Sequence, residues 1–440
     1  MGKSLTADVV RRFAAAYGGL LSPGARVVLA RDTRPSGEGL AHSAADGLMA
    51  TGCIAVDLGM CSTPAAKIMV VELGAEAGII LTASHNPAPW NGLKLIRADG
   101  VFLNQTQGTQ VESAYRAGDM VERPGGRIEH VSQDEVEDCY LDRVLSAVDV
   151  DLIRAASLRV AADPCNGAGA LFLQKLFDRL GVTATIINAK PDGMFAHEPE
   201  PIPENLVQLG DAVRDAGAAV GFAVDPDADR VALVGADGLP IGEDYTLALS
   251  IQAICADERP GPVVTTLSTS QLVSDAAEQA GRPVILTPVG EVHVVEKMIE
   301  TAAAVGGEGN GGVILTEIVP GRDAALGIAL VLQRLAAGNE SLGTLVDQLP
   351  RYAIDKRKVS GCTAAQLEAG VVALRQQHPQ AYAHPVRDGV KLYLSGQLEC
   401  PWLHLRASNT EPVVRIIAES TTAEEASQLG AEAEALLGSM

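Results

Sequence analysis

The sequence is poor in basic residues. Its 34 lysines and arginines stand against 55 aspartates and glutamates, so the formal net charge at pH 7 is −21. A surface with this charge repels the phosphates of nucleic acid and of anionic lipid, and we expect no nucleic-acid partner. If the substrate is an anion, a few arginine, lysine and backbone N–H groups must converge in one cleft to bind it.

Long apolar runs and paired cysteines are also absent. No stretch approaches 18 consecutive apolar residues, and the first ten residues lack the apolar core of a signal peptide, so the sequence predicts no association with a membrane. The seven cysteines are odd in number and include no C-x-x-C pair. This usage is typical of reduced thiols, and we expect a cytoplasmic protein.

The sequence does contain enough apolar residues for several cores. Of its 440 residues, 47% are apolar and 20% charged. This composition disfavours disorder, and at about 150 residues per domain the length predicts roughly three domains. Short runs rich in valine and isoleucine alternate with segments of helical spacing, which is typical of α/β proteins with helix-covered parallel sheets. In the first third of the chain, strands are expected at 26–30, 54–58, 78–81 and 93–96.

The pattern divides into four units, which we assign to residues 1–140, 141–244, 245–355 and 356–440. The first three share one order of elements and are predicted to be similar α/β domains with mixed sheets. In the last unit, a helix is followed by strands near 390–394, 402–406 and 413–416 and by a helix over 423–437. The last unit is therefore predicted to be a smaller α+β domain.

The first candidate site is T-A-S-H-N-P, which begins at Thr82 and is followed by N-G-L-K. It comes directly after the apolar run G-I-I-L. A polar turn after such a strand lies at the carboxyl edge of the sheet, where ligand clefts of open α/β folds form. Ser84 is therefore placed for nucleophilic chemistry. The alternative is that Ser84 and Asn86 only hydrogen-bond the backbone of a tight turn, and the segment alone does not decide between the two.

The second candidate site is D-P-D-A-D-R, between the apolar runs G-F-A-V and V-A-L-V. Asp225, Asp227 and Asp229 can direct carboxylate oxygens at one point, which suits a hard divalent cation. An EF-hand is excluded, because Arg230 and Ala236 stand where its loop needs glycine and glutamate. A solvated acidic turn is disfavoured, because three unpaired carboxylates between buried strands would repel one another without a cation.

The third candidate site is G-E-G-N-G-G, residues 307–312, which fits the dinucleotide fingerprint G-x-G-x-x-G. That fingerprint should follow a strand and open a helix, but here it follows a predicted helix at 295–304 and leads into a strand. We therefore favour a loop that presents Glu308 and Asn310 to sugar hydroxyls. A tight turn without a ligand is the alternative.

The fourth candidate site is R-A-S-N-T-E-P, which starts at Arg406. Two hydroxyls, an amide and an arginine on one turn offer several hydrogen-bond donors to a phosphate, as anion-binding backbone nests do. By itself this motif only suggests phosphate binding.

Together and in this order, the four segments resemble the α-D-phosphohexomutase family, which includes phosphoglucomutases, phosphomannomutases and phosphoglucosamine mutases. The resemblance runs along the whole chain and is most specific in T-A-S-H-N-P with N-G-L-K and in D-P-D-A-D-R. It implies a heart-shaped molecule of four domains, with one loop from each domain in a central active-site cleft.

The resemblance also implies roles for individual residues. Ser84 would carry the phosphoryl group, and Asp225, Asp227 and Asp229 would bind Mg²⁺ together with an oxygen on Ser84. The residues implied in binding the sugar are Gly290, Glu291, Glu308 and Asn310. Those implied in binding the phosphate that is not reacting are Arg406, Ser408, Asn409 and Thr410.

Lys94, His85 and Arg230 are the candidates for managing the proton and the charge at the accepting hydroxyl, and we favour Lys94 as the general acid/base. Three aspartates on Mg²⁺ and Arg230 would supply the charge neutralisation that phosphoryl transfer needs. In the implied reaction, phosphorylated Ser84 converts a hexose monophosphate into a bound 1,6-bisphosphate. This intermediate turns end for end and returns its other phosphate to the serine.

The implied enzyme is thus an intramolecular phosphotransferase that interconverts hexose 6-phosphate and hexose 1-phosphate, with a hexose 1,6-bisphosphate as activator. Its partners would be small sugar phosphates, and it would be a monomer or a homodimer.

Two departures from the family pattern affect these expectations. Members usually begin with a strand that carries a Gly-Ile-Arg-Gly-like segment, and this chain opens at M-G-K-S-L-T, where that segment would end, so the N-terminal strand is expected to be missing. Glu291 stands where one phosphomannomutase/phosphoglucomutase branch has histidine, and S-N-T-E-P stands where bacterial phosphoglucosamine mutases commonly have S-G-T-E-P. The preferred sugar stays open among glucose, mannose and glucosamine phosphates.

Other functions stay open as well. The mutase could act on glucosamine phosphate. A metal-dependent sugar phosphatase would hydrolyse the Ser84 phosphate instead of transferring it. A catalytically silent sugar-phosphate binding protein is suggested by the missing N-terminal segment.

Overall fold

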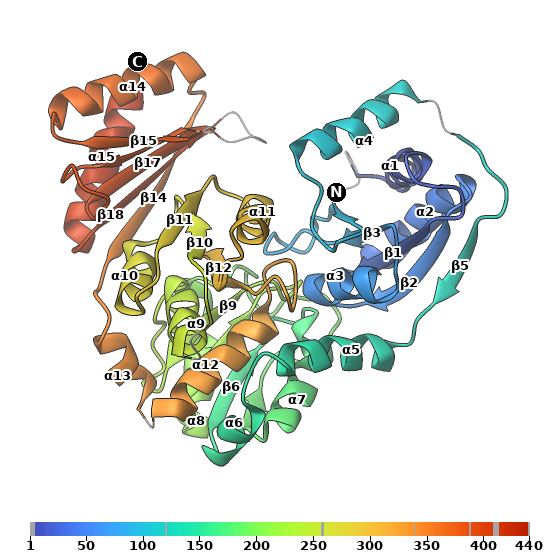
Figure 1. The fold of residues 1–440 in the computed structure, drawn as a ribbon, viewed down its shortest axis with the longest axis horizontal. Helices are drawn as coiled ribbons and strands as arrows, with labels where there is room; N and C mark the ends of the chain where they lie inside the picture. Colours follow the sequence, from blue (N-terminus) through green and yellow to red (C-terminus); the bar gives the residue numbers. More distant parts are fainter. Residues whose placement is uncertain are drawn as a thin grey trace.

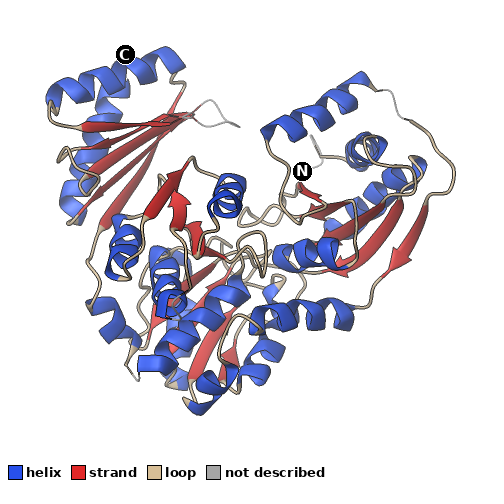
Figure 2. Ribbon diagram, in the orientation of Figure 1, coloured by secondary structure: helices blue, strands red, loops and turns tan. Residues whose placement is uncertain are grey.

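The computed structural model describes residues 5–118, 121–256, 259–338, 340–386, 389–407 and 413–438. Within these ranges the chain forms four sheets with helices packed against them, and the lobes give the molecule a heart-shaped outline (Figures 1 and 2). Three of the sheets are mixed and the C-terminal one is antiparallel. The predicted fold class, three similar α/β domains and a smaller α+β domain, is confirmed.

The first sheet has five strands in the order β4-β3-β1-β2-β5, and all its pairs are parallel except β3 with β4. The strands are β1 (Arg26–Arg31), β2 (Ile54–Met60), β3 (Ala77–Leu81), β4 (Leu93–Arg97) and β5 (Arg127–His130). The helices of this part are α1 (Ala7–Gly19), α2 (Gly37–Ala50), α3 (Thr63–Glu72), α4 (Gln105–Ala117) and α5 (Gln133–Leu145). The four strands expected here match β1 to β4 within two residues at each end.

The second sheet has four strands in the order β7-β6-β8-β9. The strands are β6 (Arg159–Asp163), β7 (Thr183–Ile186), β8 (Val220–Val224) and β9 (Val231–Gly235). The helices are α6 (Val150–Ala155), α7 (Gly169–Leu180), the 3₁₀ helix η1 (Pro203–Asn205) and α8 (Val207–Ala216).

The third sheet has the order β11-β10-β12-β13. The strands are β10 (Val263–Thr266), β11 (Val284–Thr287), β12 (Val305–Glu308) and β13 (Gly312–Ile314). The helices are α9 (Asp244–Ala256), α10 (Gln271–Gln279), α11 (Glu291–Thr301), α12 (Ala324–Gly338) and α13 (Leu342–Asp347).

These three sheets share one topology. In each, the third strand of a four-strand core lies beside the first and is followed by an antiparallel fourth strand. The antiparallel pairs are β3–β4, β8–β9 and β12–β13. The connection between the third and fourth strands therefore has the same place in every one of these domains.

The fourth sheet is antiparallel, in the order β14-β18-β17-β16-β15. The strands are β14 (Ala353–Ser360), β15 (Tyr382–Val386), β16 (Gly389–Tyr393), β17 (Trp402–Ala407) and β18 (Val413–Ser420). The helices α14 (Ala364–Gln377) and α15 (Ala423–Gly438) belong to this domain. The boundary predicted near residue 355 falls inside β14, a charged edge strand in which Lys356, Lys358 and Ser360 are exposed.

The third sheet corrects the expectation for the glycine-rich segment. Gly307 and Glu308 are the last two residues of β12, and the turn begins only at Gly309. A Cβ on Gly307 would lie 2.2 Å from the Gly312 carbonyl oxygen, so the close approach of the two strands requires glycine there. The glycines that permit this approach also remove the apolar run by which a strand is recognised.

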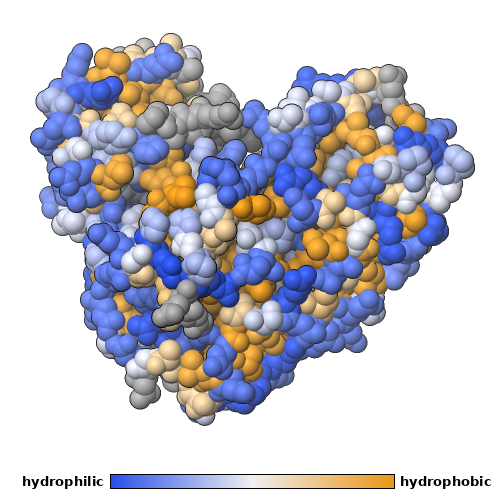
Figure 3. All heavy atoms as spheres, in the orientation of Figure 1, coloured by the Kyte–Doolittle hydropathy of each residue, from blue (hydrophilic) through white to orange (hydrophobic). Residues whose placement is uncertain are grey.

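The first three domains are joined by a continuous apolar core. Ile68 of α3, Phe172 of α7 and Ile328 of α12 belong to one buried cluster, whereas the fourth domain has a cluster of its own. The space-filling view shows a notch between the C-terminal and N-terminal lobes (Figure 3). Among the described residues, no helix has the length and apolar character of a membrane-spanning segment.

Candidate active site

The candidate site lies where the third-to-fourth-strand connections of the first three domains meet. Ser84 follows β3, the three aspartates follow β8, and Glu308 ends β12. The Ser84 hydroxyl donates a hydrogen bond to Asp225 Oδ2 at 2.9 Å, although the two residues are 141 positions apart. The structure therefore brings together the two segments that the sequence singles out most strongly.

The backbone at Ser84 is held in an unusual conformation. Its φ is +47°, in the left-handed region that non-glycine residues rarely adopt. The Ser84 N–H donates to Thr82 Oγ1 at 2.9 Å, and the Thr82 hydroxyl in turn donates to Asp32 Oδ2 at 2.7 Å. These contacts fix the turn so that the seryl hydroxyl faces the acidic loop.

Arg34 also stabilises the turn that contains Ser84. Its side chain is fully buried, with an exposed fraction of 0%, and it donates to Asp32 Oδ2 at 2.9 Å. The remaining guanidinium N–H groups donate to the backbone carbonyl oxygens of Ser84, Asn86, Pro87 and Trp90. Burial raises the pKa of Asp32 to about 6, against the opposing effect of the Arg34 charge.

Asp225, Asp227 and Asp229 are completely buried, and their ligand oxygens lie within 4.8 Å of one another. One oxygen of each is held by a donor of the protein. Asp225 Oδ1 accepts from the N–H groups of Asp229 and Arg230 at 3.1 and 3.2 Å.

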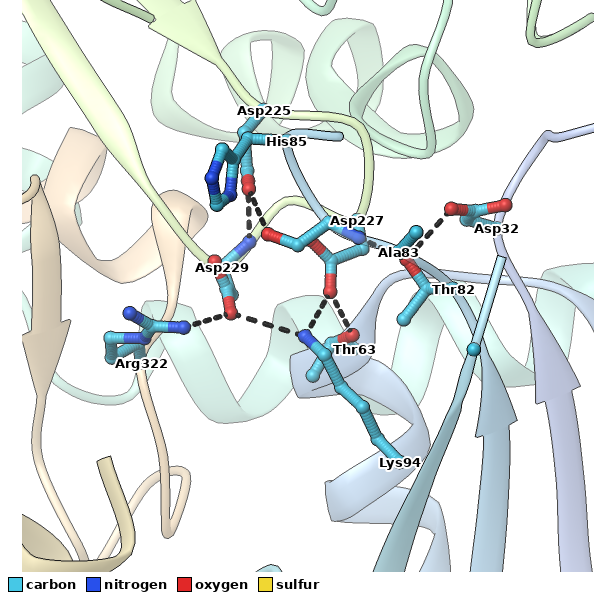
Figure 4. Close-up of polar contacts among 12 residues, drawn as sticks. Asp32, Thr63, Thr82, Ala83, His85, Lys94, Asp225, Asp227, Asp229 and Arg322 are labelled. Atoms are coloured by element: carbon cyan, nitrogen blue, oxygen red, sulfur yellow. Dashed lines mark hydrogen bonds and ion pairs between the residues drawn. The ribbon is translucent and has the colours of Figure 1, made fainter. Parts of the chain in front are cut away.

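Asp227 Oδ2 accepts from Thr63 Oγ1 and Lys94 Nζ, both at 2.6 Å. Asp229 Oδ2 accepts from Arg322 Nη2 at 2.5 Å and lies 3.4 Å from Lys94 Nζ (Figure 4). The donors therefore come from the first, second and third domains.

The second oxygen of each aspartate is available. Within the described part of the chain, Asp227 Oδ1 and Asp229 Oδ1 are buried without a hydrogen-bond partner, although Asp229 Oδ1 lies 3.5 Å from Arg230 Nε. Asp225 Oδ2 meets only the Ser84 hydroxyl and, at 3.9 Å, the Arg230 side chain. Buried carboxylate oxygens without partners are costly unless a cation binds them. These two oxygens, together with Asp225 Oδ2 and the Ser84 hydroxyl, fit the ligand set of Mg²⁺, and the outer donors fix the orientation of each carboxylate.

The three carboxylates and the nearby cations shift one another's pKa values. Burial and the charges of the other two aspartates raise the pKa of Asp225 well above its usual value. Burial acts in the same direction at Asp229, but the Arg322 and Lys94 charges outweigh it and lower its pKa. Although burial disfavours the Lys94 ammonium, the Asp227 and Asp229 carboxylates raise its pKa above the usual range. Lys94 is therefore protonated at neutral pH.

His85 and Arg230 lie together at the edge of the serine turn. Arg230 Nη2 donates to His85 Nδ1 at 2.8 Å and lies 3.5 Å from the Ser84 hydroxyl oxygen. Burial and the Arg230 charge lower the pKa of His85 to about 4, so this imidazole is neutral at pH 7. Because Nδ1 accepts a hydrogen bond, its N–H lies on Nε2.

The predicted sugar-binding residues are also close together. Glu308 Oε1 accepts from the Gly290 N–H at 3.2 Å, and Glu308 Oε2 accepts from Arg322 Nη1 at 2.7 Å. Glu291 pairs through one oxygen with Lys67 and through the other with Arg322. Asn310 has a buried side-chain oxygen without a hydrogen-bond partner among the described residues. Both oxygens of Glu291 are thus engaged by the protein itself.

The last predicted loop is only partly described. Arg406 lies near the end of β17, opposite Arg415 of β18. Ser408, Asn409 and Thr410 lie outside the described residues.

Five residues of the site were not found by motif reasoning: Asp32, Arg34, Thr63, Lys67 and Arg322. Two of them had a local signal, since Asp32 and Arg34 stand in R-D-T-R, which directly follows an apolar strand as the other candidate motifs do. Lys67 stands in the apolar helix segment T-P-A-A-K-I-M-V, where a fully buried lysine has no visible partner in the sequence. Its partner Glu291 is 224 positions away.

Comparison with known proteins agrees with this geometry. Three matches are to the α/β/α domains I, II and III of phosphoglucomutase/phosphomannomutase, over residues 1–122, 138–238 and 242–352. A fourth, over residues 362–436, is to the C-terminal domain of the same proteins. The chain belongs to the phosphoglucomutase/phosphomannomutase family.

Other members of this family match nearly the whole chain. A Thermococcus kodakarensis protein named phosphoglucomutase/phosphomannomutase is 35% identical over 431 residues, which cover 96% of this chain and 93% of that protein. A Methanopyrus kandleri protein named probable phosphoglucosamine mutase is 33% identical, over 98% of this chain and 93% of its own length.

Solved structures of the phosphoglucomutase/phosphomannomutase family have the same fold. A family protein from Burkholderia thailandensis superposes with a TM-score of 0.84 at 26% identity, covering 100% of this chain and 95% of that one. A putative phosphomannomutase from Thermus thermophilus also gives 0.84, at 27% identity, covering 99% and 96%.

Proposed function

We propose that the protein is a Mg²⁺-dependent phosphohexomutase that interconverts hexose 6-phosphate and hexose 1-phosphate. The observation that carries the proposal is the 2.9 Å hydrogen bond from the Ser84 hydroxyl to Asp225, in a buried group of three aspartates with unpartnered oxygens. A hydroxyl and a divalent-cation site in direct contact are what a phosphoserine intermediate needs.

Ser84 would carry the phosphoryl group, and Asp225, Asp227 and Asp229 would bind Mg²⁺. When bound, the cation would neutralise the charge of the phosphoryl oxygens during transfer. Arg230, whose guanidinium lies 3.5 Å from the Ser84 oxygen, would orient the same group from the other side. The left-handed turn and the Arg34 contacts would keep the seryl oxygen fixed while the substrate changes.

Lys94 would act as the general acid/base, as the sequence predicts. In the structure it is an ammonium paired with Asp227 and Asp229, so it can donate a proton to a departing seryl or sugar oxygen. His85 is neutral at pH 7 and accepts a hydrogen bond from Arg230, which suits it to positioning Arg230. Glu308 and Asn310 would contact sugar hydroxyls, with Gly290 and Glu291 beside them.

The substrate class follows from the relatives, whose names include both phosphoglucomutase/phosphomannomutase and phosphoglucosamine mutase. The 1,6-bisphosphate of the sugar would act as activator by phosphorylating Ser84. Arg406 would bind the phosphate that is not reacting, together with Ser408, Asn409 and Thr410. All seven cysteines are free, which supports a cytoplasmic enzyme.

The test is a substrate panel. Glucose, mannose and glucosamine 6-phosphates are each supplied with Mg²⁺ and a trace of the matching 1,6-bisphosphate, and the 1-phosphate product is measured. We expect conversion of at least one of the three, and their relative kcat/KM values identify the preferred sugar. No isomerisation of any of them would refute the proposal.

The same panel separates the other functions. A sugar phosphatase would release inorganic phosphate without 1-phosphate. A silent binding protein would bind a sugar phosphate in calorimetry without either product.

A further inference from the structure

Arg322 connects the acidic loop to the sugar-binding segments. Its guanidinium uses three nitrogen atoms on three carboxylates: Nη2 on Asp229 at 2.5 Å, Nη1 on Glu308 at 2.7 Å and Nε on Glu291 at 3.1 Å. The side chain is 10% exposed, and each of the three carboxylates is less exposed than that. No motif in the sequence assigns a function to Arg322.

The carboxylates around Arg322 are themselves fixed. The other oxygen of Glu308, Oε1, accepts a hydrogen bond from the Gly290 N–H. The other oxygen of Glu291 is held by Lys67, whose buried ammonium lies over the Phe102 ring, 3.8 Å from its centre. Through these contacts the guanidinium is tied to all of the first three domains.

The backbone leaves room for this side chain. A Cβ on Gly312 would lie 2.3 Å from Cδ of Arg322, so any other residue there would displace the arginine. A planar guanidinium can satisfy three carboxylates in fixed directions at once, whereas a lysine ammonium is a compact charge without a fixed fork. The arrangement is therefore specific to arginine.

We propose that Arg322 is a positioning residue for phosphoryl transfer, which couples the metal ligand Asp229 to Glu308 in the sugar site. This inference rests on the proposed function. Arg322 holds Oδ2 of Asp229, so it helps to determine where Oδ1, which accepts no hydrogen bond, points. The same guanidinium orients Glu308. A substitution at either carboxylate therefore changes the orientation of the other through Arg322.

The experiment replaces Arg322 with lysine, which keeps the charge and removes the fork. Mg²⁺ alone is titrated into the full-length protein by calorimetry, and KM and kcat are measured with the preferred sugar phosphate. Loss of an outer-shell partner weakens metal binding about 10- to 100-fold, so we expect Arg322→Lys to bind Mg²⁺ at least about 10-fold more weakly. We also expect a raised KM.

The matched control is Arg334→Lys. Arg334 lies on α12, twelve positions further along, and its side chain contacts Gln252 and Glu340 instead of the site. Arg334→Lys should leave both Mg²⁺ affinity and KM at the wild-type values.

A second variant, Glu308→Gln, keeps Arg322 in place and tests the coupling even if Arg322→Lys does not fold. We expect it to weaken Mg²⁺ binding several-fold, although Glu308 is not a proposed ligand. If Arg322 transmits the effect, Glu308→Gln should have a much smaller effect on Mg²⁺ affinity when Arg322 is already lysine. A direct charge effect would be equal in both backgrounds.

Wild-type Mg²⁺ affinity in Arg322→Lys would overturn the inference, and so would an unchanged affinity in Glu308→Gln or an equal Glu308→Gln effect in both backgrounds. In each case a wild-type protein that binds Mg²⁺ and isomerises a sugar phosphate leaves the proposed function intact. A wild-type protein that does neither overturns the proposed function and this inference together.

Discussion

The guanidinium of Arg34 donates a hydrogen bond to the carbonyl oxygen of Ser84 at 2.5 Å. The contact joins the end of β1 to the turn after β3, and it holds the proposed phosphoryl carrier in a backbone conformation that costs of order 1–3 kcal/mol for a residue with a side chain. The position of the proposed nucleophile is thus maintained by a fully buried residue.

Arg34→Lys should both destabilise the protein and impair the site. A lysine cannot reach all the carbonyl oxygens that Arg34 now satisfies, and each buried unsatisfied group costs about 1–3 kcal/mol, so we expect a loss of about 3 kcal/mol or more in the free energy of unfolding. Urea denaturation measures this loss, and kcat should fall about 10-fold or more in the folded fraction. Arg127→Lys, at an exposed arginine paired with Glu129, is the control. Equal stability of the two variants would contradict the role of Arg34.

Ser84→Ala should abolish turnover and leave the fold intact. The variant removes the proposed phosphoryl acceptor but only two hydrogen bonds, the one to Asp225 and the long one from Arg230. We expect activity to fall at least about 10³-fold with little change in circular dichroism and in the unfolding temperature. Ser43→Ala, on the exposed side of α2, should behave as wild type. Retention of wild-type rates in Ser84→Ala would mean that the nucleophile is misassigned.

Asp227→Asn should remove Mg²⁺ dependence together with activity. The amide keeps the shape of the side chain but withdraws one of three charges and one of two oxygens, so the remaining oxygen cannot both bind the cation and accept from Lys94. We expect Mg²⁺ affinity to fall about 10-fold or more. The affinity is measured by Mg²⁺ titration, once with enzyme activity as the readout and once by calorimetry. Asp237→Asn, in the exposed turn after β9, is the control. A saturable Mg²⁺ response of wild-type size in Asp227→Asn would place the metal elsewhere.

His404 should make the protein less stable in acid. It is fully buried between the third and fourth domains, where it contacts Ser268, and burial together with Lys391 and Arg406 lowers its pKa to about 3. In the unfolded chain its pKa is about 6.5, so below that pH only the unfolded state takes up the proton, and stability falls as pH falls through this window. Between pH 7 and 5 the free energy of unfolding falls by about 2 kcal/mol because of this histidine.

His404→Gln keeps a donor or acceptor for Ser268 but does not titrate. We expect its unfolding free energy to change less between pH 7 and 5 than that of the wild type, measured by denaturation at each pH. His130→Gln, at an exposed histidine, should retain the full wild-type slope. If His404→Gln shows the same slope, His404 is not the titrating group.

Much of the fold could be predicted because the strands of the α/β domains are buried on both faces. The runs at 26–30, 54–58 and 78–81 are continuous and apolar, and they coincide with β1, β2 and β3. β12 and β14 escaped notice for opposite reasons. β12 contains two glycines that allow close backbone contact, and β14 is an edge strand with four consecutive charged residues, 355–358.

In the site, the acids and the serine could be predicted because each stands in a short polar string after a strand. The cations that orient them could not. Arg34, Lys67 and Arg322 meet partners 50, 224 and up to 93 positions away, and no local spacing records which arginine faces which carboxylate. The assignment of Glu291 to the sugar stays a prediction, and the structure adds that its two oxygens are already paired.

The candidate turns of the first three domains all lie at the junction of the third and fourth strands, which bears on how sugar specificity can change. In each of the first three domains the candidate site residues lie at the end of an antiparallel pair of strands, and Arg406 lies on another such pair, β17 with β18. Under the proposed function, a small rotation of the C-terminal sheet would therefore lengthen or shorten the span available to a bisphosphate without altering any of the candidate turns. Substitutions at the interface around Ser268, outside the serine turn and the acidic loop, would thus change the size of the sugar that is accepted.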